Sequence, residues 1–368
     1  MTATFRIAVL PGDGIGPEVM APALELVRAA TERVGLALAT EAHPAGAVCW
    51  RDTGAALPRA TMDACTAADA ILLAAMGDPA IRYPDGTEIA PQLDLRFDLG
   101  LYAGMRPVRV IPGVKTPLAD PRAAGIDLVI LRESTEGLFW SRGRGEVRND
   151  AEARDTLVIT RATTARLADF AFALARSRRE RGGKNLVTCV DKANVFTSFA
   201  FFRRVFDERA AAHPDVRAAH HYIDAMALDL VRRPWEFDVM LTENMFGDII
   251  SDLGAALMGG MGYAPSADIG EAHAVFQPCH GSAPDIAGQG IANPTAMILS
   301  GAMMLEWLGE RHGEPRALRA GTLIRRAVDA AFATGRLVTP EHGGTAGTRA
   351  VAAAVGAAMA ALDPAAAA

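Results

Sequence analysis

The sequence lacks the marks of a membrane protein, a disulfide-bonded secreted protein and a general nucleic-acid binder. No segment reaches the roughly 18 uninterrupted apolar residues of a membrane span. Cys49, Cys65, Cys189 and Cys279 are scattered without CxxC spacing, which indicates a reducing compartment and no structural zinc. The net charge of -6 argues against a nucleic-acid-binding surface. The opening run FRIAVL meets PGDG at once, so no signal or transit peptide is apparent and we expect a cytoplasmic protein.

The chain has 368 residues, 50% of them hydrophobic, which is enough for a large core and favours two lobes. Short apolar runs alternate with longer helical patterns, and this alternation predicts an α/β sheet. Helices are expected from about Pro17 to Val34 and after Asn293, which can cap a helix with Pro294 in its first turn. No flexible linker or internal repeat is found. Two lobes must therefore share a continuous sheet or cross more than once.

A glycine-rich turn, PGDGIGPEV, follows the first strand and precedes the first helix. Gly12, Gly14 and Gly16 give GxGxG, whereas the dinucleotide-binding fingerprint is GxGxxG with an acidic residue about twenty positions later. The motif predicts a tight strand-to-helix turn.

Paired carboxylates in TENMFGDIISDLGAAL are more informative. Asp248 and Asp252 lie four apart in a helical pattern, so they project from one face and repel each other. Their apolar flanks favour an offsetting cation over the alternative, a solvated helix face. Oxygen ligands without nearby His or Cys indicate Mg²⁺ or Mn²⁺. Asp224 could complete the metal site, or it could equally be a helix cap.

Arg96, Arg106 and Arg132 could bind a substrate with two carboxylates, because guanidinium groups bind carboxylates through paired hydrogen bonds. This interpretation requires them to converge; each alone is more typical of a surface arginine. Lys192 follows an apolar strand, and a lysine beside other cations loses its proton more readily and can act as a general base. The alternative for Lys192 is an ion pair with Asp191.

The segment HGSAPDIAGQGIANP is a loop of small residues with one acid, Asp285. Small residues permit close backbone approach to a ligand. A carboxylate facing ribose hydroxyls favours NAD and repels the additional phosphate of NADP. The alternative is a long structural loop.

Together these segments resemble the β-decarboxylating dehydrogenases, the family of isopropylmalate, isocitrate, homoisocitrate and tartrate/D-malate dehydrogenases. The resemblance spans nearly the whole chain, and it is carried in the family's order by LPGDGIGPEV, LRFDLGLYAGMRP, LRESTEG, VDKANVF, YIDAMA, NMFGDIISD, HGSAPDIAG and GIANP. The sequence looks most similar to the tartrate/D-malate branch.

The resemblance implies an α/β fold of two domains with a shared central sheet, as in isopropylmalate dehydrogenase and unlike the Rossmann fold. Residues 1–102 with 261–368 would form the large, cofactor-binding domain. Residues 103–260 would form the small domain, with a dimer interface and an arm. In the implied homodimer, Lys192 and Asp224 come from the partner, so that each active site needs both chains.

It also implies NAD- and divalent-metal-dependent oxidation, with β-decarboxylation, of a malate-type 2-hydroxy acid such as D-malate, tartrate or 3-isopropylmalate. The three arginines would bind the dicarboxylate, the three aspartates would bind Mg²⁺ or Mn²⁺, and Lys192 and Asp224 would be catalytic. The implied cofactor-binding residues are Asn194, His280, Gly281, Ser282, Ala283, Pro284, Asp285, Ile286 and Asn293.

Three positions depart from the family pattern. Phe139 stands where the family usually has a proton-donating tyrosine, and a phenyl ring cannot donate a proton. Gln277 replaces the usual glutamate before the HGSAP loop. Gln92 offers an amide in an otherwise apolar substrate wall that includes Ile89, which suggests a small or mildly polar substituent.

Two alternatives follow from these departures. The enzyme could stop at oxidation because of Phe139, or the chain could be a non-catalytic regulatory subunit. Retention of all the predicted arginines, aspartates and Lys192 favours an enzyme.

Overall fold

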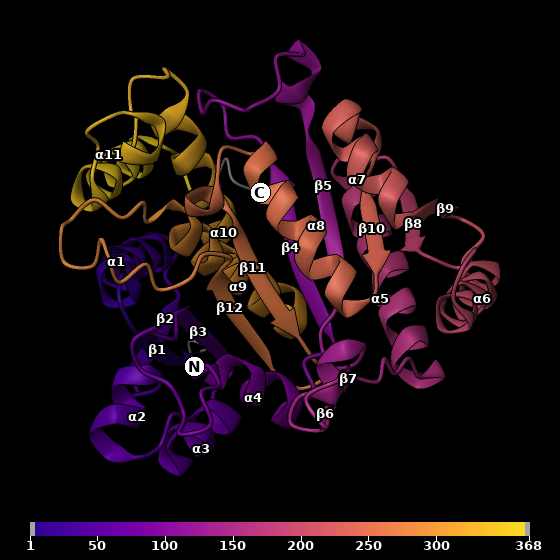
Figure 1. Ribbon diagram of the computed structural model, residues 1–368. Helices are drawn as coiled ribbons and strands as arrows, with labels where there is room; N and C mark the ends of the chain where they lie inside the picture. Colours follow the sequence, from indigo (N-terminus) through magenta and orange to yellow (C-terminus); the bar gives the residue numbers. More distant parts are fainter. Residues whose placement is uncertain (1–3, 365–368) are drawn as a thin grey trace.

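The computed structural model describes residues 4–364, which fold around one ten-stranded sheet of order β2-β1-β3-β12-β11-β4-β5-β10-β8-β9 (Figure 1). The strands of this sheet are β1 (Thr4–Gly12), β2 (Ala37–Ala42), β3 (Ala70–Ala75), β4 (Ala103–Arg109), β5 (Asp127–Glu133), β8 (Leu186–Asp191), β9 (Arg217–Tyr222), β10 (Val239–Thr242), β11 (Pro265–Ile269) and β12 (Ala274–Pro278). A separate hairpin pairs β6 (Glu146–Arg148) with β7 (Glu152–Arg154).

Eleven α-helices occur in the described part of the chain. They are α1 (Gly16–Arg33), α2 (Ala47–Thr53), α3 (Arg59–Ala67), α4 (Pro91–Asp98), α5 (Arg161–Glu180), α6 (Thr197–Ala212), α7 (Ile223–Arg232), α8 (Asn244–Leu257), α9 (Thr295–His312), α10 (Pro315–Phe332) and α11 (Thr348–Ala361). α1 and α9 confirm the two helices expected from the sequence. None of the described helices is long and apolar enough to cross a membrane.

The sheet is parallel at both ends and antiparallel in the middle. β11 runs antiparallel to β12 and β4, and β4 runs antiparallel to β5, whereas the remaining strand pairs are parallel. The strand β3, AILLAA, is buried at every position, as expected for a parallel strand covered on both faces. The expected α/β fold with a shared central sheet, distinct from a Rossmann fold, is confirmed.

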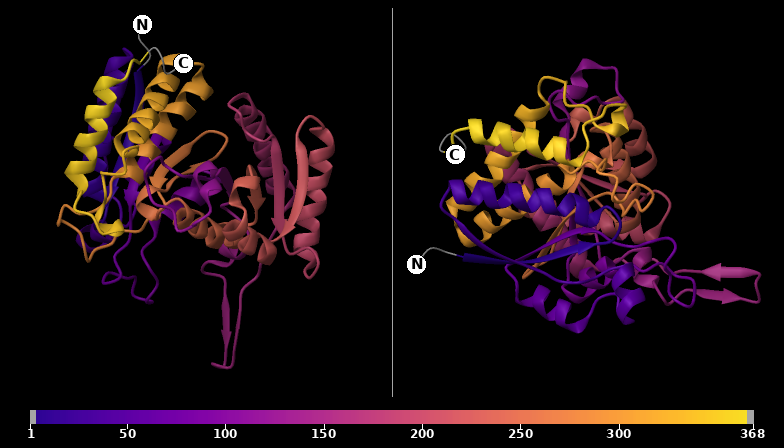
Figure 2. Two further views of the ribbon diagram at one scale, coloured as in Figure 1. Left: turned by 90° about the horizontal axis from the view of Figure 1, so that it is seen from above. Right: turned by 90° about the vertical axis from the view of Figure 1, so that its left-hand side faces the viewer.

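Strands from the two ends of the chain lie together at one side of the sheet. β1, β2 and β3 neighbour β12 and β11, while β4, β5, β8, β9 and β10 form the other side. α1, α9, α10 and α11 pack against one another over the first side (Figure 2). This order agrees with residues 1–102 and 261–368 forming one domain and 103–260 the other, and these limits remain our proposal.

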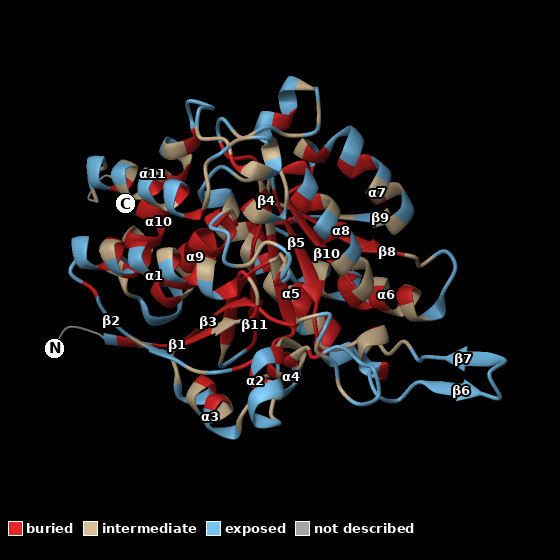
Figure 3. Cartoon of the chain, turned by 60° about the vertical axis from the view of Figure 1, so that its left-hand side comes forward, coloured by how far each residue is buried: buried red, intermediate tan, exposed pale blue. Residues whose placement is uncertain are grey.

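The β6–β7 hairpin projects away from the body of the molecule (Figure 2). All six of its strand residues are exposed, in contrast to the buried central strands (Figure 3). A two-stranded hairpin standing alone in water is only marginally stable. The hairpin, called the arm below, therefore lacks the packing that would hold it in an isolated chain.

The N-terminal turn requires its glycines. A Cβ on Gly12 would lie 1.9 Å from the carbonyl oxygen of Ala75, and one on Gly14 would lie 2.0 Å from that of Ser282. Asp13 accepts hydrogen bonds from the backbone N–H groups of Ala47 and Gly77 at 2.7 and 2.8 Å. The turn thereby ties β1 to the end of β3 and to the loop that carries Ser282.

Candidate active site

The three predicted arginines converge on one cavity of about 180 Å³ where the antiparallel centre of the sheet meets α4 and α8. Arg96 comes from the last turn of α4, Arg106 from β4 and Arg132 from β5. All three are at most 7% exposed, which excludes the alternative of three surface arginines. The wall also includes Gln92, Asp248, Asp252, Gln277, Cys279, His280 and Gly281.

The helix α8 presents both predicted aspartates to this cavity. It follows β10 directly, and the carboxylate of Glu243 caps it by accepting hydrogen bonds from the N–H groups of Met245 and Phe246 at 3.1 and 3.3 Å. Burial, and after it the charge of Asp248, raises the pKa of Asp252. Asp248 also accepts a hydrogen bond from Arg132. Two carboxylates one helical turn apart at the wall of one cavity supply the oxygen ligands that a divalent cation prefers.

Lys192 and Asp224 pair with each other outside this cavity. Lys192 Nζ donates to Asp224 Oδ1 at 2.5 Å, and this hydrogen bond lowers the pKa of Asp224. The alternative partner of Lys192, Asp191, instead binds Arg203 at 2.7 and 2.8 Å. Asp224 lies in the first turn of α7, after the N-cap residue Tyr222, so the helix-cap alternative is also wrong.

One chain alone does not assemble the predicted metal site. Within residues 4–364, no group of three or more His, Cys, Asp or Glu side chains is placed to hold a metal ion. Asp248 and Asp252 lie at the cavity, whereas Asp224 is held by Lys192 elsewhere. The contribution of Lys192 and Asp224 to a partner's site therefore remains a prediction.

A buried carboxylate that the sequence reasoning missed supports two of the arginines. Asp268, in β11, accepts hydrogen bonds from Arg96 Nε at 3.0 Å and Arg106 Nη2 at 3.1 Å. Burial opposes its charge, but Arg96, Arg106 and Arg132 outweigh burial and lower the pKa of Asp268 to about 2. The available signal was an acid inside the apolar strand PSADI, because a buried charge needs a partner.

Arg132 is held from the other side by α8. Its Nε donates to Asn244 Oδ1 at 2.9 Å, and the Asn244 amide donates to the Glu136 carbonyl at 2.9 Å. Burial, and next the positive charge of Arg96, lower the pKa of Arg132 to about 10, so it stays charged at neutral pH. The ring of Phe139 lies 4.9 Å from the Arg132 guanidinium carbon. Phe139 thus contacts a predicted substrate-binding residue without lining the cavity.

The loop predicted to bind the cofactor begins at the cavity. His280 and Gly281 line it, and the Ser282 carbonyl accepts a hydrogen bond from Ile15 N at 2.7 Å. Asp285 is exposed, and its carboxylate has no protein partner among the described residues; its contact with a ribose remains a prediction. Ala283, Pro284 and Ile286 complete this stretch of the loop.

Two predicted cofactor residues lie differently. Asn293 is buried, and its side chain already binds Thr295 and Glu341. Asn194 is exposed beyond β8, away from the cavity lining. Asn293 therefore supports the start of α9, and a direct contact of either residue with a cofactor remains a prediction.

Comparisons with known proteins identify the family of this chain. The family model described as isocitrate/isopropylmalate dehydrogenase matches residues 6–356. A 3-isopropylmalate dehydrogenase of Salinibacter ruber is 44% identical over 333 residues, covering 87% of this chain and 89% of the relative. The enzyme of the same name from Moorella thermoacetica is 42% identical over 343 residues, covering 91% and 94%.

Solved structures show the same likeness. Isocitrate dehydrogenase from Methylococcus capsulatus superposes with a TM-score of 0.84 at 36% identity, covering 96% of this chain and 99% of that one. A beta-decarboxylating dehydrogenase from Thermococcus kodakarensis gives 0.78 at 38% identity, covering 97% and 96%. These names support neither the expected tartrate/D-malate branch nor a regulatory subunit. The chain belongs to the isocitrate/isopropylmalate dehydrogenase family, whose members use NAD and Mg²⁺ or Mn²⁺.

Proposed function

We propose that this protein catalyses the NAD- and Mg²⁺- or Mn²⁺-dependent oxidation of a malate-type 2-hydroxy dicarboxylate, followed by loss of CO2. The observation that carries the proposal is the convergence of Arg96, Arg106 and Arg132 on a cavity that also holds Asp248 and Asp252. Arginines supply paired hydrogen bonds to carboxylates, and the aspartates supply oxygen ligands for a hard cation.

Each residue has a role in this reaction. The arginines bind and orient the two carboxylates, so that the C2 hydrogen faces the cofactor. Lys192 of a second chain takes the hydroxyl proton, with Asp224 beside it. Asp248 and Asp252 would hold the cation, which when bound would supply Lewis-acid stabilisation of negative charge at the C2 oxygen, and the 280–286 loop would hold NAD as the hydride acceptor. Asp285 favours NAD because a carboxylate repels the additional phosphate of NADP.

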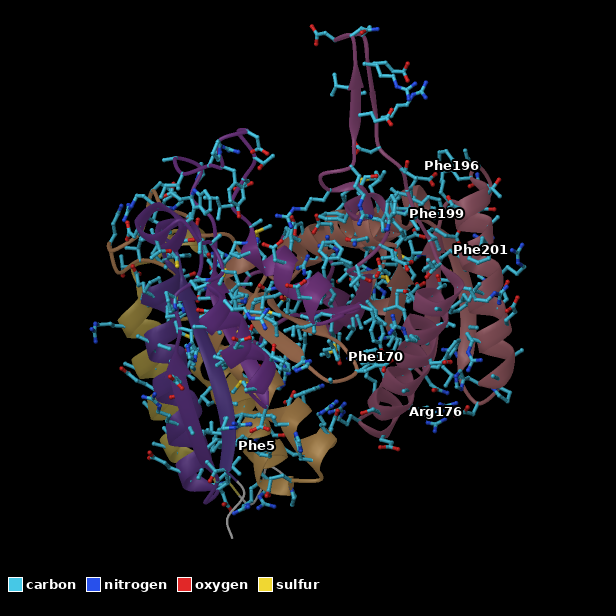
Figure 4. The ribbon with its side chains drawn as sticks, turned by 90° about the horizontal axis from the view of Figure 1, so that it is seen from below. Phe5, Phe170, Arg176, Phe196, Phe199 and Phe201 are labelled. Atoms are coloured by element: carbon cyan, nitrogen blue, oxygen red, sulfur yellow. The ribbon has the colours of Figure 1, made fainter. Side chains whose placement is uncertain are left out.

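The proposal requires a homodimer, and the surface of the chain supports one. Large apolar side chains stand exposed on adjacent helices: Leu228 (55%) and Val231 (48%) on α7, and Ile249 (63%) on α8. Phe196, 53% exposed, lies at the end of α6 nearest the arm (Figure 4). Burial of apolar surface drives association, and a partner would also supply the packing that the arm lacks.

The names of the relatives favour 3-isopropylmalate as the substrate. One observation favours a more polar substituent instead: Gln92 Oε1 is buried at the cavity wall without a hydrogen-bond partner. A substrate hydroxyl at C3, as in tartrate, would satisfy this acceptor. Ile89, expected in the wall, is packed against Ala47 and does not line the cavity.

A substrate panel tests the proposal. Purified protein is incubated with NAD, Mn²⁺ and the stereoisomers of malate, tartrate, 3-isopropylmalate, isocitrate and homoisocitrate, and NADH and CO2 are measured separately. We expect both products from a dicarboxylate. NADH without CO2 would show that the reaction stops at oxidation, as the replacement of the family's tyrosine by Phe139 allows. No NADH from any of these acids would refute the dehydrogenase proposal.

A further inference from the structure

The carboxylate of Asp268 lies behind the arginines, outside the cavity itself. It is 1% exposed and is absent from the cavity wall, although both of its arginine partners line that wall. A third neighbour, Gln277, also lines the cavity, and its Nε2 donates to Asp268 Oδ2 at 2.8 Å. Asp268 therefore touches three side chains that face the substrate and does not face it.

The surrounding strands make room for this carboxylate. Asp268 is paired in the sheet with Gly104 of β4, and a Cβ at position 104 would lie 3.2 Å from Asp268 Oδ1 and 2.4 Å from Ser134 Oγ. The Ala267 carbonyl accepts a second hydrogen bond from Arg106, at 3.0 Å. Gly104 leaves the space that the Asp268 carboxylate occupies, and a larger side chain at position 104 would fill that space.

These bonds determine which guanidinium N–H groups remain for a substrate. Arg96 uses Nε for Asp268, and its two Nη groups donate to no protein acceptor within residues 4–364. Arg106 uses both Nη groups for Asp268 and for backbone carbonyls. Because a guanidinium is planar, fixing one edge fixes the direction of the other. The carboxylate thus aims the arginines.

Asp268 also sets the charge of the site. Arg96, Arg106 and Arg132 with Asp248 and Asp252 carry one net positive charge, and Asp268 cancels it. A divalent cation then leaves a site that a doubly negative substrate neutralises, whereas a triply negative substrate would bring one uncompensated charge into a buried cavity. Uncompensated buried charge is costly.

We propose that Asp268 is a positioning residue, which aims Arg96 and Arg106 at the substrate and matches the site to dicarboxylates over tricarboxylates. This inference rests on the proposed function, since it takes the cavity to be the substrate site. Gln277 belongs to the same hydrogen-bond network, because its amide donates to Asp268. A glutamate at position 277 would instead repel the Asp268 carboxylate.

The probes are 3-isopropylmalate and isocitrate, which carry C3 substituents of similar size and differ by one carboxylate. Their binding is measured by calorimetry with Mg²⁺ and without NAD, and their oxidation is measured separately. We expect the wild-type protein to bind 3-isopropylmalate more tightly than isocitrate. Asp268→Asn should weaken 3-isopropylmalate binding by at least about tenfold, the loss expected for one charge-assisted hydrogen bond, and should reduce the preference.

The double variant Asp268→Asn/Gln277→Glu moves the negative charge to the adjacent side chain and should restore the preference for the dicarboxylate. Asp238→Asn is the matched control, because Asp238 is equally buried, binds Arg178 at 2.6 Å and lies away from the cavity. It should lower the melting temperature and leave the preference unchanged.

Equal effects of Asp268→Asn and Asp238→Asn on binding would reduce Asp268 to a structural role, and an unchanged preference in Asp268→Asn would overturn the inference. Wild-type binding of the dicarboxylate without NADH formation would refute the dehydrogenase proposal alone, because the binding comparison does not depend on catalysis.

Discussion

At the scale of single residues, the candidate site is a set of charges held by specific partners. Arg132 lies between Asn244 and Asp248, and Arg96 is held by Asp268. Lys192 stands apart from these, since its ammonium binds Asp224 alone. A lysine with one partner at the end of a strand has the freedom that proton transfer requires.

Lys192→Met tests this role. Methionine keeps most of the length and volume of lysine without a proton acceptor, so kcat for substrate oxidation should fall by about 10²- to 10⁴-fold, as is typical for loss of a general base. The melting temperature should change little, because Lys192 is partly exposed. Lys184→Met, in the loop before β8, is the control and should behave as the wild-type protein. A kcat within about tenfold of wild type would exclude Lys192 as the base.

At the scale of elements, α8 packs so closely on β5 that a methyl group does not fit between them. A Cβ at Gly247 would lie 2.7 Å from both Cβ and Cγ of Arg132. Alanine normally stabilises a helix relative to glycine by about 0.5–1 kcal/mol. At this position the overlap with Arg132 opposes that gain. The position of the Arg132 side chain therefore requires a glycine at residue 247 of α8.

Gly247→Ala should therefore displace Arg132 and raise KM for the dicarboxylate by about tenfold or more, equivalent to about 1.4 kcal/mol of binding. Gly356→Ala in α11 is the matched control, because a Cβ there meets only Leu26 Cδ2, at an ordinary 3.5 Å. It should leave KM unchanged and raise the melting temperature slightly. Wild-type KM in Gly247→Ala would show that Arg132 does not need its present position.

At the scale of the whole molecule, Lys192 and Asp224 lie outside the cavity lining, so the roles proposed for them would require two chains in each active site. The exposed apolar side chains of α7 and α8 and the exposed arm would provide the surface for the proposed association. In a two-fold symmetric dimer the same surface serves both chains.

Mixing two inactive variants tests the sharing of sites. In the proposed dimer, each site takes Asp248 from one chain and Lys192 from the other. A mixed dimer of Lys192→Met and Asp248→Asn chains therefore has one site with both changes and one wild-type site. After co-refolding of equal amounts, activity should recover to about a quarter of wild type, because about half of the dimers are mixed and each has one intact site.

The matched control mixes Lys192→Met with Asp224→Asn. Both residues are contributed by the same chain to the same site, so no mixed dimer contains an intact site, and no recovery is expected. Equal recovery in both mixtures, or in neither, would contradict active sites built from two chains.

Local geometry explains how much of the site the sequence could predict. Asp248 and Asp252 share a helix face because four residues make about one turn, and three closely spaced glycines between a strand and a helix indicate a tight turn at Gly12 and Gly14. The motifs in their order also predicted the α/β fold with its shared sheet. The carboxylate pair and the turn depend on neighbours in the chain, whereas the shared sheet was implied by the family resemblance.

Contacts between distant segments were decided only by the tertiary structure. Arg96 and Asp268 are 172 positions apart, and only the antiparallel pairing of β11 with β4 brings that acid beneath α4. The pairing of Lys192 with Asp224, rather than Asp191, likewise depends on where α7 follows β9. Sequence alone determined which charges this protein carries and which of them share one element. The packing of the sheet decided which charges neutralise one another, because ion pairing depends on distance in space and burial, neither of which is contained in residue order.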